Sequence, residues 1–216
     1  DAPGVVAGRD IEATGTWLGV ARGGRFAAVT NLRRSGQPGG VRSRGLLVAG
    51  WLREEQEAIE HGATLVPRAD DYAGVNFLFA DARTLCAWSN EDNRVRTLEA
   101  GVHGVSNAPL DVEWPKVSRL KRAYARHRTL EEDALIGALL DVLRDDTLAA
   151  DDELPDTGIG LARERVLSPI FIVGGGYGTR CSSVVLREPN GRVRFVERRY
   201  DSHGHVCGES EHEVLP

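Results

Sequence analysis

Alternating apolar and polar residues near the start of the chain predict a β-hairpin. In "GTWLGVARGGRFAAVTNLR" the alternation is typical of two strands, over about residues 16–21 and 25–31. Gly23 and Gly24 lie between them and supply the positive φ angles that a two-residue hairpin turn requires. We therefore expect two antiparallel strands here.

The spacing of apolar residues becomes helical after the loop "RSGQPGG". Ser43 is a suitable N-cap, and Gly62 is a typical stop signal, so one helix is predicted from Ser43 to about His61. Apolar and small residues lie toward one side of this helix: Leu46, Leu47, Gly50, Trp51 and Ala58.

Short β-rich pieces follow Pro67, in "GVNFLFAD", "TLCAWSN" and "RVRTLEAGVHGVSN", and they predict an antiparallel meander. Two helices are predicted next. "WPKVSRLKRAYARH" carries a proline at an early helical position, and "TLEEDALIGALLDVLRDD" pairs Thr129 with Glu132 as a capping box.

The last part of the chain returns to strand character after a short helix at about residues 161–167. "SPIFIV" is predicted to be a strand, and "CSSVVLREPNGRVRFVERRY" to be a second hairpin that turns at Asn190 and Gly191. The final "HVCGESEHEVL" is predicted to be an edge strand.

This order of elements favours an α+β fold built from antiparallel sheets, because strands and helices do not alternate as they do in βαβ units. Two such sheets stacked face to face, each covered by helices, would form a four-layer αββα sandwich. No linker interrupts the chain, so residues 1–216 are predicted to form a single domain.

Composition excludes several classes of partner. The 216 residues carry a net charge of -5, which argues against a nucleic-acid partner, because contact with phosphates needs a basic stripe. The one basic cluster, "RLKRAYARHR", is more typical of a solvated helix face. No apolar run approaches the roughly 18 to 20 residues that span a bilayer, so no membrane span is expected.

Three widely spaced cysteines match neither a disulfide framework nor a four-ligand zinc site. A reducing compartment is the simplest interpretation, so we expect a cytoplasmic protein without a metal or cofactor. His203 and His205 would share one face of a strand, but no further ligand beyond Cys207 accompanies them.

The stretch "YGTRCSS" contains both a cysteine and an arginine that could be functional. Arg180 would lower the pKa of the Cys181 thiol only if both side chains faced the same way, and neighbouring strand residues face opposite ways. Cys181 is therefore predicted to be a buried structural residue.

Three polar residues follow apolar segments and could line one pocket at an edge of the sandwich: Asn31, Asn107 and Arg180. An asparagine amide can donate a hydrogen bond to a developing oxyanion, and an arginine can bind a carboxylate or support a thiolate. Taken one by one, an asparagine after a strand is also a common turn residue.

Several motifs together resemble the NRDE family, also called the transport and Golgi organisation protein 2 family. The resemblance runs from about Val5 to Tyr200 and is carried by "AGRDIEATGTWLGVARGGRFAAVTNLR", "VRSRGLLVAGWL", "GVHGVSNAPLDVEWPKV", "LPDTGIGLARERVLSPIFI" and "YGTRCSSVVL". Members of that family are similar to N-terminal nucleophile hydrolases, which have the αββα sandwich.

The resemblance implies hydrolysis of a linear carbon-nitrogen (amide) bond by an N-terminal cysteine. Asn31 in "VTN" and Asn107 in "GVSN" match the asparagines on the oxyanion side, and Arg180 in "GTR" matches the late active-site arginine. The alternative is a non-catalytic protein that binds or carries haem or an acyl-CoA, in which Arg180 would pair with a propionate or phosphate. Trp17 and Tyr177 could then line an apolar wall, although a core or turn role is the competing interpretation.

The sequence departs from the family pattern at its start. Family members begin Met-Cys and carry an Asn-Arg-Asp-Glu motif shortly afterwards, whereas this chain begins at Asp1 and has no N-terminal cysteine. We therefore expect that the N-terminal strand and its motif are missing from the sequence, and that the nucleophile is missing with them.

Overall fold

Six strands form an antiparallel sheet whose spatial order follows the chain, in a computed structural model that describes residues 3–36, 39–174 and 176–216. The strands are β1 (Val5–Ala7), β2 (Leu18–Ala21), β3 (Arg25–Asn31), β4 (Val75–Ala80), β5 (Leu85–Ser89) and β6 (Arg94–Thr97). The turn between β2 and β3 has Gly23 at φ 71° and Gly24 at φ 69°, which confirms the predicted hairpin.

A second antiparallel sheet contains β7 (Cys181–Arg187), β8 (Val193–Tyr200) and β9 (Val206–Val214), in that order. The predicted hairpin between the first two strands is confirmed, and Gly191 has a φ of 89° in its turn. The predicted final strand is also confirmed as β9, which lies at one edge of this sheet.

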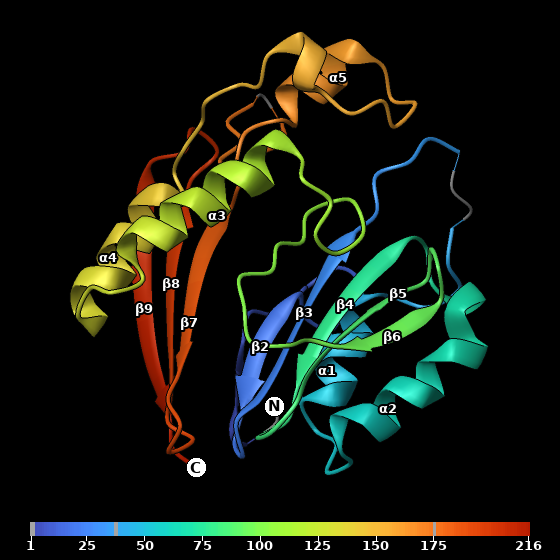
Figure 1. Cartoon of the computed structure of the whole chain (residues 1–216), viewed down its shortest axis with the longest axis vertical. Coiled ribbons are helices and arrows are strands. Elements are labelled where there is room, and N and C mark those ends of the chain that lie inside the picture. The colour runs from blue at the N-terminus through green and yellow to red at the C-terminus, as the bar shows by residue number, and fades with distance from the viewer. Residues whose placement is uncertain (1–2, 37–38, 175) are drawn as a thin grey trace.

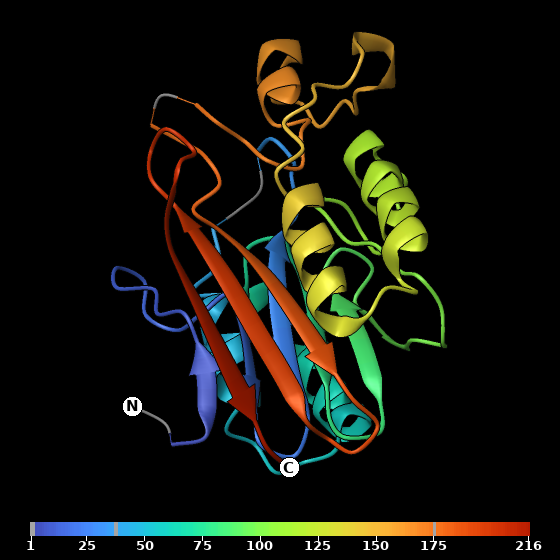
Figure 2. The ribbon, with the colours of Figure 1, turned by 90° about the vertical axis from the view of Figure 1, so that its left-hand side faces the viewer.

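Helices lie on the outer sides of both sheets, and they cover only part of the three-stranded one (Figures 1 and 2). They are α1 (Gly45–Trp51), α2 (Ala58–Leu65), α3 (Pro115–His127), α4 (Glu132–Val142) and α5 (Leu161–Val166), with short 3₁₀ helices at Val66–Asp71 and Asp151–Glu153. Helices α1 and α2 pack on the six-stranded sheet, α4 packs on the three-stranded sheet, and α5 lies across one end of the layers (Figures 1 and 2).

Among the described residues, the core is divided into three clusters, one at each interface between neighbouring layers. Alternating strand residues face opposite sides, so Ala27 and Val29 of β3 pack toward α1 and α2, while Phe26 packs toward the other sheet. Between the sheets, Val20 of β2 belongs to the same buried cluster as Phe195 of β8. The predicted α+β class with antiparallel sheets is therefore confirmed.

The single helix predicted from Ser43 to His61 was wrong, because the chain forms α1 and α2 with a break between them. The carboxylate of Asp81 accepts a 2.7 Å hydrogen bond from the backbone N–H of Ala58 and so begins a new helix there. Gly62 does not end the helix. It lies inside α2, where a β-carbon would come within 2.6 Å of the Val95 side chain.

Two other local predictions were wrong. Helix α4 begins at Glu132 after Glu131, so Thr129 does not cap it. The segment "SPIFIV" forms no strand: the N–H of Phe171 bonds to the carbonyl of Asp145, and its ring packs on Tyr200 at a centroid distance of 4.7 Å. Phe171 therefore packs from a loop instead of pairing in a sheet.

Candidate functional site

Asn31 and Asn107 are brought together by the fold, although they are far apart along the chain. Asn31 is the last residue of β3, and Asn107 lies in the loop between β6 and α3. The Nδ2 amide of Asn107 donates a 2.9 Å hydrogen bond to the backbone carbonyl of Asn31. In return, the backbone N–H of Arg33 donates a 2.7 Å bond to the backbone carbonyl of Asn107. The end of β3 is thereby tied to this loop.

The other end of the Asn107 amide faces two cations. Its Oδ1 accepts hydrogen bonds from the guanidinium of Arg33 at 3.3 Å and from Nζ of Lys116 at 3.4 Å. Both cations also donate to the backbone carbonyl of Leu167, at 3.2 Å and 3.1 Å. We call Asn107, Arg33 and Lys116 the Asn107 cluster.

A buried ion pair anchors this cluster to α5. The guanidinium of Arg33 lies 2.7 Å from the carboxylate of Glu164, and their side chains are only 9% and 3% exposed. The second carboxylate oxygen of Glu164 accepts hydrogen bonds from the backbone N–H and the hydroxyl of Thr157. Because every oxygen has a donor, the buried carboxylate is well compensated.

Local sequence explains how α3 delivers Lys116. Trp114 has an extended backbone at the N-cap position, and Pro115 begins the helix, where its missing N–H costs nothing. Lys116 therefore lies in the first turn, and the ring of Trp114 lies 4.9 Å from the Arg33 guanidinium. Burial is the main cause that lowers the pKa of Lys116 to about 8; the positive charge of Arg33 adds to this effect, and Glu164 opposes it.

A cavity of about 260 Å³ adjoins the Asn107 cluster. Arg34, which pairs with Glu91, lies in its wall with Trp114. The full lining consists of Leu32, Arg33, Arg34, Glu91, Asn107, Ala108, Pro109, Trp114, Pro155, Asp156 and Thr157. The wall thus mixes polar and apolar side chains and includes one aromatic ring.

Two buried amide oxygens lie near the end of the six-stranded sheet without a donor among the described residues. They are the Oδ1 atoms of Asn31 and Asn76. The Nδ2 of Asn76, in contrast, donates to the hydroxyl of Thr30 and to the carbonyl of Ala108. Unsatisfied acceptors of this kind are expensive to bury and often mark functional positions.

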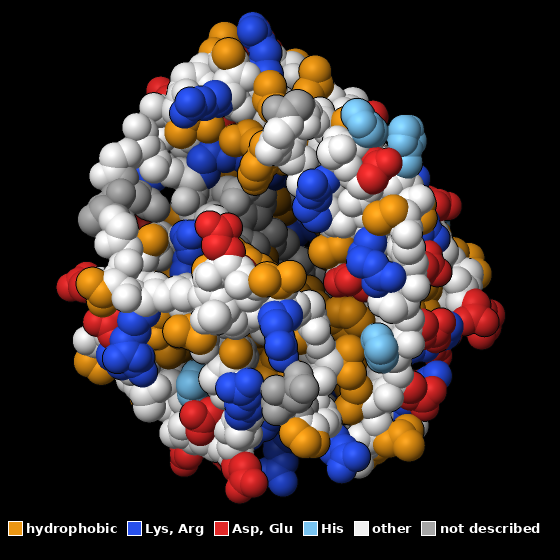
Figure 3. Space-filling model, turned by 180° about the vertical axis from the view of Figure 1, so that it is seen from behind, with side chains coloured by type: hydrophobic (Ala, Val, Ile, Leu, Met, Phe, Trp, Pro, Cys, Tyr) orange, Lys and Arg blue, Asp and Glu red, His pale blue; other side chains and the backbone are white. Residues whose placement is uncertain are grey.

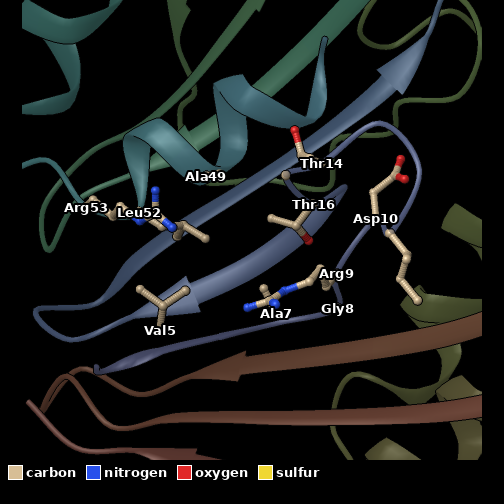
Figure 4. A pocket seen from close by; sticks show the side chains of 12 residues that line it. Val5, Ala7, Gly8, Arg9, Asp10, Thr14, Thr16, Ala49, Leu52 and Arg53 are labelled. Atoms are coloured by element: carbon tan, nitrogen blue, oxygen red, sulfur yellow. The ribbon is translucent and has the colours of Figure 1, made fainter. Parts of the chain in front are cut away.

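A larger cavity, of about 670 Å³, lies between β1, the loop of residues 8–16 and α1 (Figure 4). Asp10, Thr14 and Arg53 are among its lining side chains. The described wall contains none of the five candidate residues of the sequence analysis.

Arg180, Trp17 and Tyr177 are not joined to the Asn107 cluster by a hydrogen bond or ion pair between described residues. Arg180 is exposed just before β7, and β7 begins at the end of the layers where β3 ends (Figure 1). Trp17 is 41% exposed beside the Arg44 guanidinium, which lies 5.7 Å from its ring. Tyr177 is 69% exposed, so neither aromatic residue is in the core.

Cys181 is exposed, so the prediction of a buried structural cysteine was wrong. Its thiol is nevertheless not activated, because desolvation and the Glu197 carboxylate raise its pKa to about 11. Burial likewise raises the pKa of the Cys86 thiol. Neither thiol has the lowered pKa of a catalytic nucleophile.

The described residues contain no group of three or more His, Cys, Asp or Glu placed to hold a metal ion. Within the same residues, no helix is both long and apolar enough to cross a bilayer. On the face opposite to that of Figure 1, Lys and Arg side chains are interspersed with Asp and Glu instead of forming one basic patch (Figure 3).

Sequence patterns did not single out Arg33, Lys116 or Glu164 as candidate site residues. Their surroundings explain this, because Lys116 and Glu164 lie in charged helical segments that are typical of solvated faces. The family resemblance did point to Lys116 and Glu164, because Lys116 lies in "DVEWPKV" and Glu164 in "GLARERV", which belong to the motifs that carry it.

Comparison with known proteins gives consistent matches along the chain. The family model described as Transport and Golgi organisation 2 matches residues 1–202. The Transport and Golgi organization protein 2 homolog of Bos taurus is 32% identical over 214 residues, which cover 90% of this chain and 76% of the relative. The homolog of Homo sapiens is 30% identical over 215 residues with the same coverage. Transport and Golgi organization protein 2 of Drosophila melanogaster is 25% identical over 232 residues, covering 94% and 81%.

Proposed function

The chain belongs to the Transport and Golgi organisation 2 family, and from that premise we propose that it is a single domain of the N-terminal nucleophile type that serves hydrolysis of a linear amide bond. The two facing antiparallel sheets with helices outside support this fold. The orientation of the Asn107 amide is the observation that carries the proposed activity.

Asn107 would donate to the oxyanion of the reaction. Its Nδ2 carries two hydrogens, and the bond to the Asn31 carbonyl occupies one of them. The second hydrogen can stabilise a negative oxygen without any change of protonation. Asn31 would contribute as the neighbouring donor on the same side of the substrate, and its buried Oδ1 would be satisfied by the bound substrate or a water.

The nucleophile would be the N-terminal cysteine that the family resemblance implies; the thiols of Cys86 and Cys181 both have raised pKa values. Its thiolate would attack the amide carbon, and the carbon-nitrogen bond would break as the α-ammonium of the same cysteine protonates the leaving amine. Water would then hydrolyse the thioester, releasing a carboxylic acid and restoring the thiol. Arg180 would bind a substrate carboxylate at the edge of the site, with Trp17 and Tyr177 as apolar contacts.

A second candidate function is binding of haem or an acyl-CoA without catalysis. It is supported by Arg33, Arg34 and Trp114, which line one cavity, with the Arg33 guanidinium over the Trp114 ring. The cavity of about 260 Å³ is smaller than the roughly 300–1,000 Å³ of ligand pockets. It would therefore receive only an anionic part of such a ligand, a propionate or a phosphate.

The decisive experiment uses the chain preceded by the Met-Cys start and the Asn-Arg-Asp-Glu segment that the resemblance implies. We expect turnover of at least one member of a panel of linear amides, and its loss when the N-terminal cysteine becomes alanine. Asn107→Ala should lower kcat about 10²- to 10³-fold, as removal of one oxyanion donor does. Asn190→Ala, in the distant β7–β8 turn, is the matched control and should not change kcat.

Haemin and acyl-CoA titrations of the same proteins separate the two candidates. Saturable binding that is independent of the cysteine, together with no turnover, would support the carrier. Turnover that survives the cysteine change, or that ignores Asn107→Ala, would contradict the hydrolase.

A further inference from the structure

The orientation of an asparagine side chain depends on its partners, because its oxygen and nitrogen ends have nearly the same shape. At Asn107 the partners are of opposite kinds. Oδ1 faces the guanidinium of Arg33 and the Nζ of Lys116, and Nδ2 faces the carbonyl of Asn31. A flipped amide would place N–H groups against two cations and an oxygen against a carbonyl, so only the observed orientation is compatible with these neighbours.

The two cations are held in place by groups on other elements. Both donate to the Leu167 carbonyl, Arg33 is paired with Glu164, and Nζ of Lys116 lies 5.9 Å from the centre of the Trp114 ring. These negative or electron-rich partners offset the repulsion between two positive charges that share one acceptor. The pair is therefore part of a fixed arrangement.

We infer that Arg33 and Lys116 are positioning residues, which keep the Asn107 amide nitrogen directed at Asn31 and the reacting region, and that the charge of Lys116 sets how firmly the amide is held. The inference deepens the proposed function and rests on it for its catalytic consequence. In this arrangement both cations act through Asn107.

We call the arrangement in which Arg33 and Lys116 hold the Asn107 amide the clamp. The protonation of Lys116 makes the strength of the clamp depend on pH. The charged groups that face Lys116 are Arg33, which follows β3, and Glu164 on α5. Burial, with help from Arg33 and against Glu164, lowers the pKa of the ammonium to about 8. Below that pH the bond to Oδ1 is charge-assisted, which roughly doubles the strength of a neutral bond. Above it, Lys116 is a neutral amine, and Arg33 alone supplies a charged donor.

NMR spectroscopy of the 216-residue chain tests the clamp without any need for turnover. In protein labelled with ¹³C and ¹⁵N, we expect the side-chain carbonyl carbon of Asn107, assigned by its absence from Asn107→Ser, to titrate with a midpoint near pH 8. Lys116→Arg should abolish this titration, and Lys116→Met should speed solvent exchange of the Asn107 Nδ2 hydrogens about ten-fold at pH 7. Lys121→Met is the matched control on the same helix, because Lys121 pairs with Asp111 and Glu113 instead.

A flat Asn107 signal between pH 6.5 and 9.5, or the same titration in Lys116→Arg, would overturn the inference. If the extended protein hydrolyses amides, Lys116→Met should lower kcat about ten-fold with little change in KM, and Lys116→Arg should restore most of it while shifting the alkaline limb of the pH profile. Titration of Asn107 without any amidase activity would reject the proposed function and leave the clamp intact. Activity with a flat Asn107 signal would reject the clamp alone.

Discussion

Glu164 on α5 binds the guanidinium of Arg33 at 2.7 Å across 131 residues of sequence, and both side chains are almost fully buried. A buried ion pair is costly to break from one side, because the remaining charge loses its partner but stays out of water. The pair therefore joins the α5 segment to the end of β3 more firmly than a surface pair would.

Removing only the arginine should strongly destabilise the protein. We expect Arg33→Met to lower the free energy of unfolding by about 3–5 kcal/mol in urea titrations, since Glu164 is left buried and unpaired. The neighbouring Arg34→Met is the control: Arg34 pairs with Glu91 but is 61% exposed, so its loss should cost less than about 1 kcal/mol. Equal effects of the two substitutions would refute a special role for the buried pair.

A glycine in α2 should be required for close packing. In Gly62→Ala the new β-carbon would lie 2.6 Å from a methyl group of Val95, so we expect a loss of about 1–3 kcal/mol in unfolding free energy. Gly137→Ala in α4 meets nothing within 4 Å and should stabilise the protein by up to about 1 kcal/mol, through helix propensity. Thermal and urea unfolding check both values, and a stabilising Gly62→Ala would contradict the packing argument.

Asp111 should make stability depend on pH at the acidic end. Hydrogen bonds from His103 and Lys121 outweigh desolvation and lower the pKa of its carboxyl to about 2, below the ordinary 3.8. The contribution of the Asp111 carboxylate to the free energy of unfolding is therefore complete above about pH 4 and is lost as the pH falls toward 2. We expect the free energy of unfolding, measured in urea titrations, to fall less between pH 4 and 2.5 in Asp111→Asn than in the unaltered protein. The difference should be less than about 1 kcal/mol, because the carboxylate is partly exposed.

His103, the partner of Asp111, makes the stability of the fold depend on pH in the opposite direction. The Asp111 bond raises the pKa of the imidazole above 6.5, so its contribution is present below pH 6.5 and disappears as the pH rises through the raised value. Asp111→Asn should lower the pKa of His103 in an NMR titration. Glu99→Gln is the control, because His103 contacts only the backbone carbonyl of Glu99; an equal shift in both variants would disprove the assignment.

The Cys181 thiol should react slowly in spite of its exposure. A pKa of about 11 leaves about a hundred-fold less thiolate at pH 8 than a pKa of 9 would. Glu197→Gln removes a carboxylate that raises this pKa, so we expect faster alkylation of Cys181 by iodoacetamide, measured by mass spectrometry of the modified peptide. Glu188→Gln, in the β7–β8 turn, is the control, and the idea fails if both variants react alike.

The hairpins could be predicted from sequence because their information is local. Gly23 and Gly24 have the positive φ angles of the turn that they were expected to form, and Gly191 does the same in the second hairpin. The break between α1 and α2 could not be predicted in this way, because the carboxylate that begins α2 belongs to Asp81, 23 residues away.

In the candidate site, too, some residues could be predicted from local sequence, and others depend on distant parts of the chain. Asn31 and Asn107 could be singled out because each follows an apolar segment and because the family resemblance indicated both. Glu164 could not, since its burial is caused by Arg33 from a remote part of the chain and by Thr157 in the preceding loop. A carboxylate between two arginines in "RER" has the pattern of a solvated helix until the tertiary partner is known.

The strand order has a consequence for how the chain folds during synthesis. In both sheets each described strand pairs with the next one along the chain, so all six strands of the first sheet have been synthesised by Thr97, and the other sheet needs only residues after Arg180. Such pairings close short loops, apart from the β3–β4 connection that carries α1 and α2, and local contacts form quickly. At about 5–20 residues per second on the ribosome, the first sheet can form seconds before the second emerges. We therefore expect formation of the buried cluster that contains Val20 and Phe195, which closes the interior between the sheets, to be among the last steps of folding on the ribosome.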